Sequence, residues 1–391
     1  MKRLSTAALA APVLVLAACA ESSRPGPSEP VQGLAAVAPG AVAALHAWSI
    51  DTVAAGLNNP RGLTFGPDGD LFVAEGGTGG SNSTVGQCTQ VPAPIGPYTG
   101  GYTSRISRID RHGNRTTVVD GLPSSSTTPL TGGLTSGVAD IAFIGRTMYA
   151  VFAGAGCSHG VPDVPNAVIR VHRNGTWSIV ADLSTFQAAN PVQNPELDDF
   201  EPDGTWYSMA AVDGQLFAVE PNHGELDRIS VEGHRHARVR RVVDISATQG
   251  HIVPTVLAVR HDRFFVSNLS TFPLVPGAST ILEITRHGEI ARTFGHLTGV
   301  LGLAFDRRGR LFALENTVCP TADPCGPTPG TGALVRVKRD GTVETAVSGL
   351  MFPTGLTLGP DGALYVSVFG FGFPPGAGQV LRIAVGDGDD D

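Results

Sequence analysis

The sequence contains few charged residues for its length, and its basic residues form no stripe. Charged residues make up 16% of the 391 positions, and the formal net charge is −8. Nucleic acids and anionic membrane surfaces are bound by clustered Lys and Arg, which pair with phosphates. The composition therefore argues against both as binding partners.

No long stretch has the apolar stripe of an amphipathic helix. The chain instead contains 50 Gly and 29 Pro, and 42% of its residues are hydrophobic, in repeated short runs. Short apolar runs between turn residues are typical of strands, and this hydrophobic content excludes a disordered chain. The composition thus predicts an all-β protein.

Common signatures of catalysis are also missing. The sequence has no Gly-x-Ser-x-Gly, no phosphate-binding loop, no dinucleotide fingerprint and no His-Glu-x-x-His. Ser/His/Asp catalysis stays open, although no spacing suggests it. A functional site must therefore be assembled from residues that are distant in sequence.

One short unit recurs near both ends of the chain. Residues 58–75 read NNPRGLTFGPDGDLFVAE, and residues 352–368 read FPTGLTLGPDGALYVSV. In Gly-Pro-Asp-Gly, Pro presets the first turn angle, Asp bonds its own backbone, and Gly takes the positive φ. Each unit predicts two apolar strands joined by a tight turn. Neighbouring copies must cover the faces of such a hairpin.

Six copies of this unit align along the chain. Their first strands centre on Leu63, Ile141, Met209, Leu257, Leu303 and Leu356, and their second strands read LFVAE, MYAVF, LFAVE, FFVSN, LFALE and LYVSV. A third strand and, in all but the last copy, a fourth follow each pair. Four antiparallel strands repeated six times predict a six-bladed β-propeller. Two separate β domains are the alternative.

The last copy lacks its fourth strand. Residues 50–57, IDTVAAGL, match the pattern of this missing strand and precede the first copy. We expect this N-terminal strand to complete the last blade and close the ring, which also removes an open sheet edge.

The first residues have the features of an export signal. A basic start is followed by the apolar segment Ala7–Leu16, which is too short to span a membrane. Leu16-Ala17-Ala18-Cys19 resembles the lipobox of bacterial lipoproteins. That resemblance implies cleavage before Cys19, lipidation of its side chain and a membrane-anchored protein outside the cytoplasm. An ordinary signal peptide with an incidental Cys is the alternative.

These features predict four parts of the chain. They are a signal peptide over residues 1–18, a flexible Pro/Ser/Ala tether over residues 19–45, the propeller over residues 46–385 and an acidic tail over residues 386–391.

In a propeller, the loops into each first strand and out of each second strand share one face. In this sequence all the long irregular segments are predicted in these loops. We call the face that carries them the long-loop face, and we expect the functional site there. This face also carries Cys88, Cys157, Cys319 and Cys325. Outside the cytoplasm thiols pair, so Cys88–Cys157 and Cys319–Cys325 disulfides are expected. A structural zinc site is the alternative, although the spacings match no common zinc pattern.

Oxygen donors end four of the six second strands. These residues are Glu75, Glu220, Asn268 and Glu315. Three carboxylates and an amide oxygen would suit calcium if they converge above the channel. Alternatively, each Glu pairs with one of the arginines that recur in the third strands, such as Arg108 and Arg382.

Other polar residues are predicted near the mouth of the channel. We expect a ligand to contact Arg61, Asp140, Tyr207, Asn222, Thr255 and Thr354. His223, within Glu-Pro-Asn-His-Gly-Glu, is the candidate catalytic base.

Two segments carry a family resemblance. Residues 59–69, with Val73-Ala74-Glu75-Gly76-Gly77, and the run EPNHGELDR at 220–228 resemble the ScyD/ScyE family over residues 50–385. The resemblance implies an exported, NHL-like propeller. Six-bladed relatives include calcium-dependent lactonases and quinone-dependent sugar dehydrogenases, but their site motifs cannot be matched here residue by residue.

Two functions remain open from the sequence. The first is a binding or scaffold module whose long-loop face contacts a protein, a glycan or a small polar ligand, with Tyr98, Phe369, Phe371 and Phe373 as aromatic anchors. The second is a calcium-dependent hydrolase or sugar dehydrogenase-like enzyme that uses His223 as its base.

Overall fold

The computed structural model describes residues 48–195, 197, 200–232, 236–319 and 325–384. The predicted signal peptide, Cys19, the tether and the acidic tail lie outside these residues and remain predictions. Among the residues described, no helix is long and apolar enough to cross a membrane.

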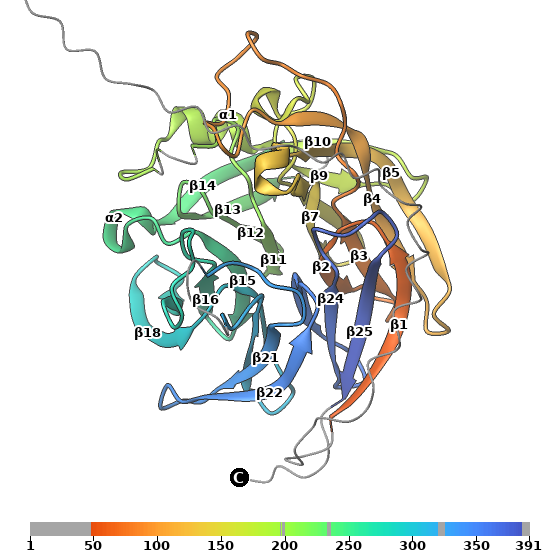
Figure 1. Cartoon of the computed structure of the whole chain (residues 1–391), viewed down its shortest axis with the longest axis vertical. Coiled ribbons are helices and arrows are strands. Elements are labelled where there is room, and N and C mark those ends of the chain that lie inside the picture. The colour runs from red at the N-terminus through yellow and green to blue at the C-terminus, as the bar shows by residue number, and fades with distance from the viewer. Residues whose placement is uncertain (1–47, 196, 198–199, 233–235, 320–324, 385–391) are drawn as a thin grey trace, which may run out of the picture. The chain divides into compact units, whose positions relative to one another are not determined.

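The strands form six antiparallel sheets arranged in a ring, which confirms the predicted six-bladed propeller (Figure 1). Blade 1 contains β2 (Pro60–Phe65), β3 (Leu71–Glu75), β4 (Thr99–Ile109), β5 (Arg115–Ser126) and the short β6 (Thr135–Ser136). Blade 2 contains β7 (Val138–Ile144), β8 (Thr147–Phe152), β9 (Ala167–Val171) and β10 (Trp177–Asp182). Blade 3 contains β11 (Ser208–Val212), β12 (Gln215–Glu220), β13 (Glu225–Glu232) and β14 (His236–Asp244).

The other three blades follow the same order from the channel outward. Blade 4 contains β15 (Pro254–Arg260), β16 (Arg263–Asn268), β17 (Ser279–Thr285) and β18 (Ile290–Leu297). Blade 5 contains β19 (Val300–Phe305), β20 (Leu311–Glu315), β21 (Gly332–Val337) and β22 (Val343–Leu350). Blade 6 contains β23 (Gly355–Leu358), β24 (Leu364–Val368), β25 (Gly378–Ala384) and β1 (Ser49–Leu57).

The N-terminal strand closes the ring as predicted. β1 pairs antiparallel with β25, from Ser49 opposite Ala384 to Leu57 opposite Gly378. In Figure 1, orange β1 lies beside blue β25. Because β25 starts at the long-loop face, β1 begins at the opposite face, which we call the short-turn face.

Besides the short 3-10 helices Pro129–Thr131 and Cys157–His159, three elements of the described chain were not predicted. β6 adds a fifth strand to blade 1 by pairing Ser136 with Ser125 of β5. Helix α1 (Leu183–Ala189) follows β10, and the Asp182 carboxylate caps it by accepting a hydrogen bond from Thr185 N at 2.8 Å. The short helix α2 (Ser246–Gln249) follows β14. These elements belong to the connections between blades, where the repeat pattern gives no guidance.

Apolar side chains pack between neighbouring blades, and glycines permit their close approach at the channel. One cluster joins Ile106 of blade 1 to Ile141 and Ile169 of blade 2. A Cβ atom on Gly62 would lie 2.2 Å from Asp140 Oδ1, so a larger residue there would separate blades 1 and 2. The tight ring of first strands positions the functional candidates.

Candidate functional site

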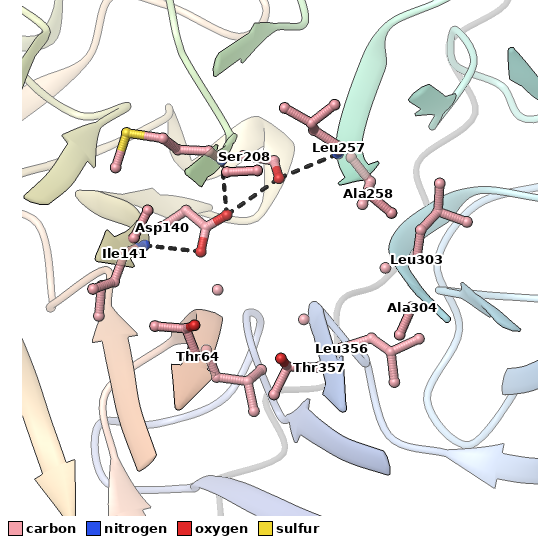
Figure 2. A pocket seen from close by; sticks show the side chains of 18 of the residues that line it. Thr64, Asp140, Ile141, Ser208, Leu257, Ala258, Leu303, Ala304, Leu356 and Thr357 are labelled. Carbon is pink, nitrogen blue, oxygen red and sulfur yellow. Dashed lines mark hydrogen bonds between the residues drawn. The ribbon is translucent and has the colours of Figure 1, made fainter. Parts of the chain in front are cut away.

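The first strands of the six blades enclose a cavity of about 410 Å³. Most of the residues that line it have apolar side chains, and Figure 2 shows Ile141, Leu257, Leu303 and Leu356 around it, but polar atoms form the larger part of its exposed surface. Asp140 is the only charged residue in this wall among the residues described. The volume suits a small ligand.

Asp140 links the wall of the cavity to the next blade. Its Oδ2 accepts hydrogen bonds from Met209 N at 2.8 Å and Ser208 Oγ at 3.1 Å, and its Oδ1 accepts one from Ile141 N at 2.8 Å (Figure 2). Burial raises the pKa of Asp140 to about 6, although these hydrogen bonds favour the ionised form. The carboxyl group therefore titrates close to neutral pH.

Arg61 and Tyr207 lie at the same end of the cavity. The Tyr207 hydroxyl is 3.4 Å from the Thr354 carbonyl oxygen, and the Arg61 guanidinium donates to the Thr135 carbonyl oxygen. Burial raises the pKa of Tyr207, the neighbouring Arg61 lowers it, and the charge of Asp140 raises it. Residues from blades 1, 2 and 3 thus converge at the mouth of the channel on the long-loop face.

Two threonines complete this mouth. Thr255 and Thr354 both line the cavity, and their hydroxyls donate to Val300 O and Pro60 O of the following blades, each at 2.7 Å. Asn222 lies outside the cavity wall and accepts a hydrogen bond from the Thr205 hydroxyl. The structure therefore brings four of the six predicted ligand-contacting residues to the cavity wall, Asp140, Tyr207, Thr255 and Thr354. Arg61 lies beside Tyr207 outside the wall, and Asn222 lies elsewhere.

An aromatic cluster flanks the mouth. Phe352 stacks on Phe371 with ring centres 4.6 Å apart, and Phe373 packs against Phe352 and Phe369. The Arg61 guanidinium lies 5.9 Å from the centre of the Phe371 ring. The cluster thus provides apolar surface beside Arg61, outside the residues that line the cavity.

Tyr98 does not belong to this surface, contrary to the sequence-based expectation of an aromatic anchor. Its side chain is only 6% exposed, and its hydroxyl donates to Glu201 Oε1 at 2.9 Å. The partner comes from a loop more than a hundred residues away, so the sequence pattern did not reveal it.

Glu75 has a structural environment. Its carboxylate is fully buried and accepts hydrogen bonds from Asn58 N at 2.7 Å, Ser107 Oγ at 2.5 Å and Arg115 Nη2 at 2.9 Å. Arg105 Nε lies 3.2 Å from the same carboxylate. Two cations and three hydrogen-bond donors already satisfy this group.

The other strand-end residues repeat the pattern. Glu220 accepts a hydrogen bond from Thr205 N at 2.8 Å, and Glu315 accepts one from Thr298 N at 2.7 Å. In each case the amide belongs to the loop that leads into the first strand of the same blade. Asn268 makes the equivalent link with reversed polarity, since its amide donates to Ile252 O at 2.8 Å.

These four residues therefore do not fit a shared calcium site. Each fastens a loop of its own blade, and in the described part of the chain no three His, Cys, Asp or Glu side chains are placed to hold a metal ion. Burial raises the pKa of Glu315 to about 7, as expected for a carboxyl group with no cation beside it.

The alternative pairing of strand-end Glu with the arginines that recur in the third strands is wrong for Arg108 and Arg382, although Arg105, at another position of β4, lies beside Glu75. Arg108 Nε donates to Asp70 Oδ2 at 2.6 Å, and Arg382 Nε donates to Asp361 Oδ2 at 2.7 Å. Both partners belong to turns at the short-turn face, whereas the strand-end Glu residues lie at the other end.

His223 is buried inside blade 3. It is 5% exposed, its Nδ1 contacts the Gln187 amide and lies 3.8 Å from Glu220 Oε2, and its ring packs edge-on against Phe200 at 5.1 Å. It does not line the channel cavity. The structure therefore gives His223 no contact with the site where a ligand would bind.

Beside Asn222 and His223, β13 carries two buried acids, Glu225, which the sequence also places near the candidate site, and Asp227, which sequence reasoning missed. Glu225 pairs with Arg241, and Asp227 Oδ2 accepts a hydrogen bond from Trp206 Nε1 at 3.1 Å. Burial is the main cause that raises both pKa values, to about 9 for Glu225 and about 7 for Asp227. Acids two positions apart in a strand share a face, so their spacing was the available signal.

Both predicted disulfides are present. Cys88–Cys157 joins a long loop of blade 1 to one of blade 2, and Cys319–Cys325 lies within a loop of blade 5. Next to the first bridge, fully buried His159 lies 3.1 Å from Glu201 Oε2, and the other oxygen of Glu201 accepts the Tyr98 hydrogen bond. Burial by itself would lower the pKa of His159, but the charge of Glu201, its hydrogen bond and the charge of Asp203 together raise that pKa above its ordinary value.

No family model matches the chain, and no curated protein matches its sequence. Solved structures share its fold. A protein from Thermus thermophilus, described as a candidate oxidoreductase (glucose dehydrogenase), is 21% identical with a TM-score of 0.53, over 86% of this chain and 100% of that one. A glucose dehydrogenase is 13% identical with a TM-score of 0.50, over 86% and 99%.

A third similar structure is a protein of unknown function from Bacteroides thetaiotaomicron VPI-5482. It is 12% identical with a TM-score of 0.52, over 87% of this chain and 76% of that one. At such identities these structures support the propeller fold alone. The resemblance to the ScyD/ScyE family stays a prediction.

Proposed function

We propose that the protein binds a small polyhydroxylated ligand, of the sugar class, at the long-loop mouth of its central channel. The observation that carries this proposal is the meeting of Asp140 and Tyr207 in the wall of a 410 Å³ cavity, with Arg61 beside Tyr207. A carboxylate accepts hydrogen bonds from ligand hydroxyls, and guanidinium and phenol groups donate to ligand oxygens. The apolar side chains of the lining and the nearby Phe371 suit the apolar face of a sugar ring, and the polar atoms exposed in the cavity suit its hydroxyls.

A second candidate function is catalysis at the same mouth. Asp140, with a pKa of about 6, would be a general base that is ionised at neutral pH and still basic enough to accept a proton. The glucose dehydrogenases of similar fold suggest sugar oxidation as a reaction to test, in which Asp140 would take the hydroxyl proton and a separate two-electron acceptor such as a quinone would take the hydride. In this proposal Asp140 takes the role that the sequence suggested for His223, and no step requires calcium.

Export and lipid anchoring form part of the proposal. The apolar segment before Cys19 and its lipobox-like neighbours support them. Cys19→Ala should release the protein from membranes, and unchanged membrane retention would contradict a lipid anchor.

Binding can be tested by calorimetric titration of the purified full chain with a panel of aldoses, aldonic acids and their lactones. We expect saturable binding of at least one member, weakened roughly tenfold or more by Asp140→Asn because a charged hydrogen-bond acceptor is lost. Glu315→Gln is the matched control, since Glu315 is a buried carboxyl group outside the cavity wall. Equal affinities of the wild-type chain and Asp140→Asn for every member would contradict the proposal.

The enzyme candidate is tested separately with the same panel. Sugar oxidation is followed with an artificial electron acceptor, and lactone hydrolysis with a pH indicator. Turnover that falls below pH 6 and is lost in Asp140→Asn would support catalysis. Binding without turnover would leave the binding function alone.

A further inference from the structure

A second pocket lies far from the channel mouth, on the short-turn face between blades 3 and 4. Its volume is about 390 Å³. Its apolar part includes Phe217, which is only 4% exposed, and its polar groups come from β13 and from turns of both blades. None of these residues lines the cavity at the channel.

The repeats show what is unusual about Arg228 in this pocket. The third strands of blades 1 and 6 carry arginines at the same register, opposite an aromatic residue of the second strand. Arg108 is neutralised by Asp70, and Arg382 by Asp361, each an acid of the preceding turn in its own blade. These blades serve as internal references for blade 3.

Blade 3 has an arginine at the same position, but the acid of its turn pairs with a different residue. Arg228 stands opposite Phe217, as the register requires. The acid of its turn, Asp213, instead pairs with Arg286 of blade 4 at 2.8 Å. Within the ranges that the structure describes, Arg228 has no hydrogen bond or ion pair, so its guanidinium lines the pocket without a counter-charge.

The charges of the pocket are separated by depth. The carboxylates of Asp213 and Asp262 are 78% and 89% exposed, whereas the Arg286 side chain is 25% exposed. Water screens the rim carboxylates far more than the deeper guanidinium groups. Arg286 Nε is also buried without a hydrogen-bond acceptor among the described residues, and its guanidinium lies 6.0 Å from the centre of the Phe217 ring.

We propose that this pocket binds an oxyanion, a carboxylate or a phosphate group, through the guanidinium of Arg228 and the Nε of Arg286. The planar fork of a guanidinium matches the paired oxygens of such groups. An anion would supply an acceptor to Arg228 and to Arg286 Nε, whereas Arg286 Nη2 already contacts Asp213. The apolar surface of Phe217 favours an anion that carries an apolar part. This site is independent of the ligand proposed for the channel mouth.

The test is calorimetric titration of the full chain with inorganic phosphate and with benzoate, at constant ionic strength against chloride. We expect saturable binding of at least one anion, weakened at least about tenfold by Arg228→Gln because a charge-assisted hydrogen bond is lost. Arg228→Lys keeps the positive charge but not the planar fork, so its affinity should lie between those of the wild type and Arg228→Gln. Arg382→Gln is the matched control and should bind as the wild type does.

Two results would overturn this site. One is an Arg228→Gln variant that binds both anions like the wild type, and the other is a response to phosphate and benzoate no larger than to chloride. Asp140→Asn should leave anion binding intact, so the failure of one site is distinguishable from the failure of the other. The source of the anion can be assigned with Cys19→Ala protein, mixed with phosphatidylglycerol vesicles and sedimented. Sedimentation with the vesicles that is lost when Arg228→Gln is added would assign the anion to a lipid headgroup. Phosphate binding without such sedimentation would assign a free anion.

Discussion

Two groups of polar residues occupy the long-loop face, and the blades use them differently. Glu75, Glu220 and Glu315 repeat one side chain at equivalent positions, and each accepts a backbone N–H from its own blade. Where the chain enters the first strands, the blades instead present different side chains, including Asp140 and Tyr207, which meet at the channel. Repetition therefore maintains the scaffold, whereas departure from the repeat marks the ligand site.

The largest expected effect is on the scaffold. Glu75→Gln removes a buried charge and leaves Arg105 and Arg115 without their carboxylate partner. The free energy of unfolding should fall by about 3 kcal/mol, as for a broken buried ion pair, measured by guanidinium unfolding. Asp68→Asn is the control, because Asp68 and its partner Arg146 are both 63% exposed, and it should cost less than about 1 kcal/mol. An equally small decrease in the free energy of unfolding for Glu75→Gln would contradict the structural role of Glu75.

The next effect concerns pH at the channel mouth. The pKa of Asp140 is raised to about 6 by burial, above the value of about 3.9 for an unfolded chain, so the folded state binds more protons between these pH values. Its contribution to stability is therefore greatest at low pH and decreases as the pH rises through this window. The free energy of unfolding contributed by Asp140 should thus fall by roughly 2 kcal/mol between pH 4 and pH 7, after allowance for water in the channel. Asp140→Asn should remove this dependence on pH.

The comparison for that slope is urea unfolding of wild type and Asp140→Asn at several pH values. Glu315 and Asp227 have pKa values raised to about 7, and they change stability with the same sign in both proteins. The difference between the two proteins thus isolates Asp140. A difference that does not depend on pH would contradict the burial of this carboxyl group.

Glu315 sharpens the contrast with Glu75, because burial raises its pKa and no cation is among the causes of the shift. Glu315→Gln keeps an oxygen that can accept the Thr298 hydrogen bond and removes a charge that is costly above pH 7. Relative to the wild type, this variant should gain stability between pH 6 and pH 8.5, by about 1 kcal/mol. Thermal unfolding at both pH values measures this, and a loss at high pH would indicate an unseen cationic partner.

The smallest expected effect is that of metal removal. The strand-end carboxylates already have partners within the protein, so a chelator should leave the melting temperature of the full chain unchanged. A lower melting temperature that calcium restores, and that Glu220→Gln abolishes, would reinstate the calcium site expected from the sequence.

The fold could be predicted because its information is local and periodic. The apolar anchors from Leu63 to Leu356 repeat in every blade, and the orphan strand that became β1 has the same pattern as the fourth strands. The mouth residues Asp140 and Tyr207 followed from their places in this repeat. Their polar neighbours, however, depended on how the strands twist around the channel.

The strand-end residues show where sequence reasoning failed. Glu75 occupies the predicted position, but its side chain turns towards Asn58 and Arg115 of the scaffold rather than the channel. A strand pattern specifies alternation, and which of the two faces points to the axis is fixed only by tertiary packing. Buried partners from distant loops, as for Tyr98 and Glu201, leave no local signal.

The most direct test of the account is a crystal structure of the full chain with a sugar that shows saturable binding. Difference density should lie at the channel mouth, in contact with Asp140 and with Arg61 or Tyr207. A ligand bound elsewhere, or a cation held jointly by Glu75, Glu220 and Glu315, would contradict the separation of scaffold and site.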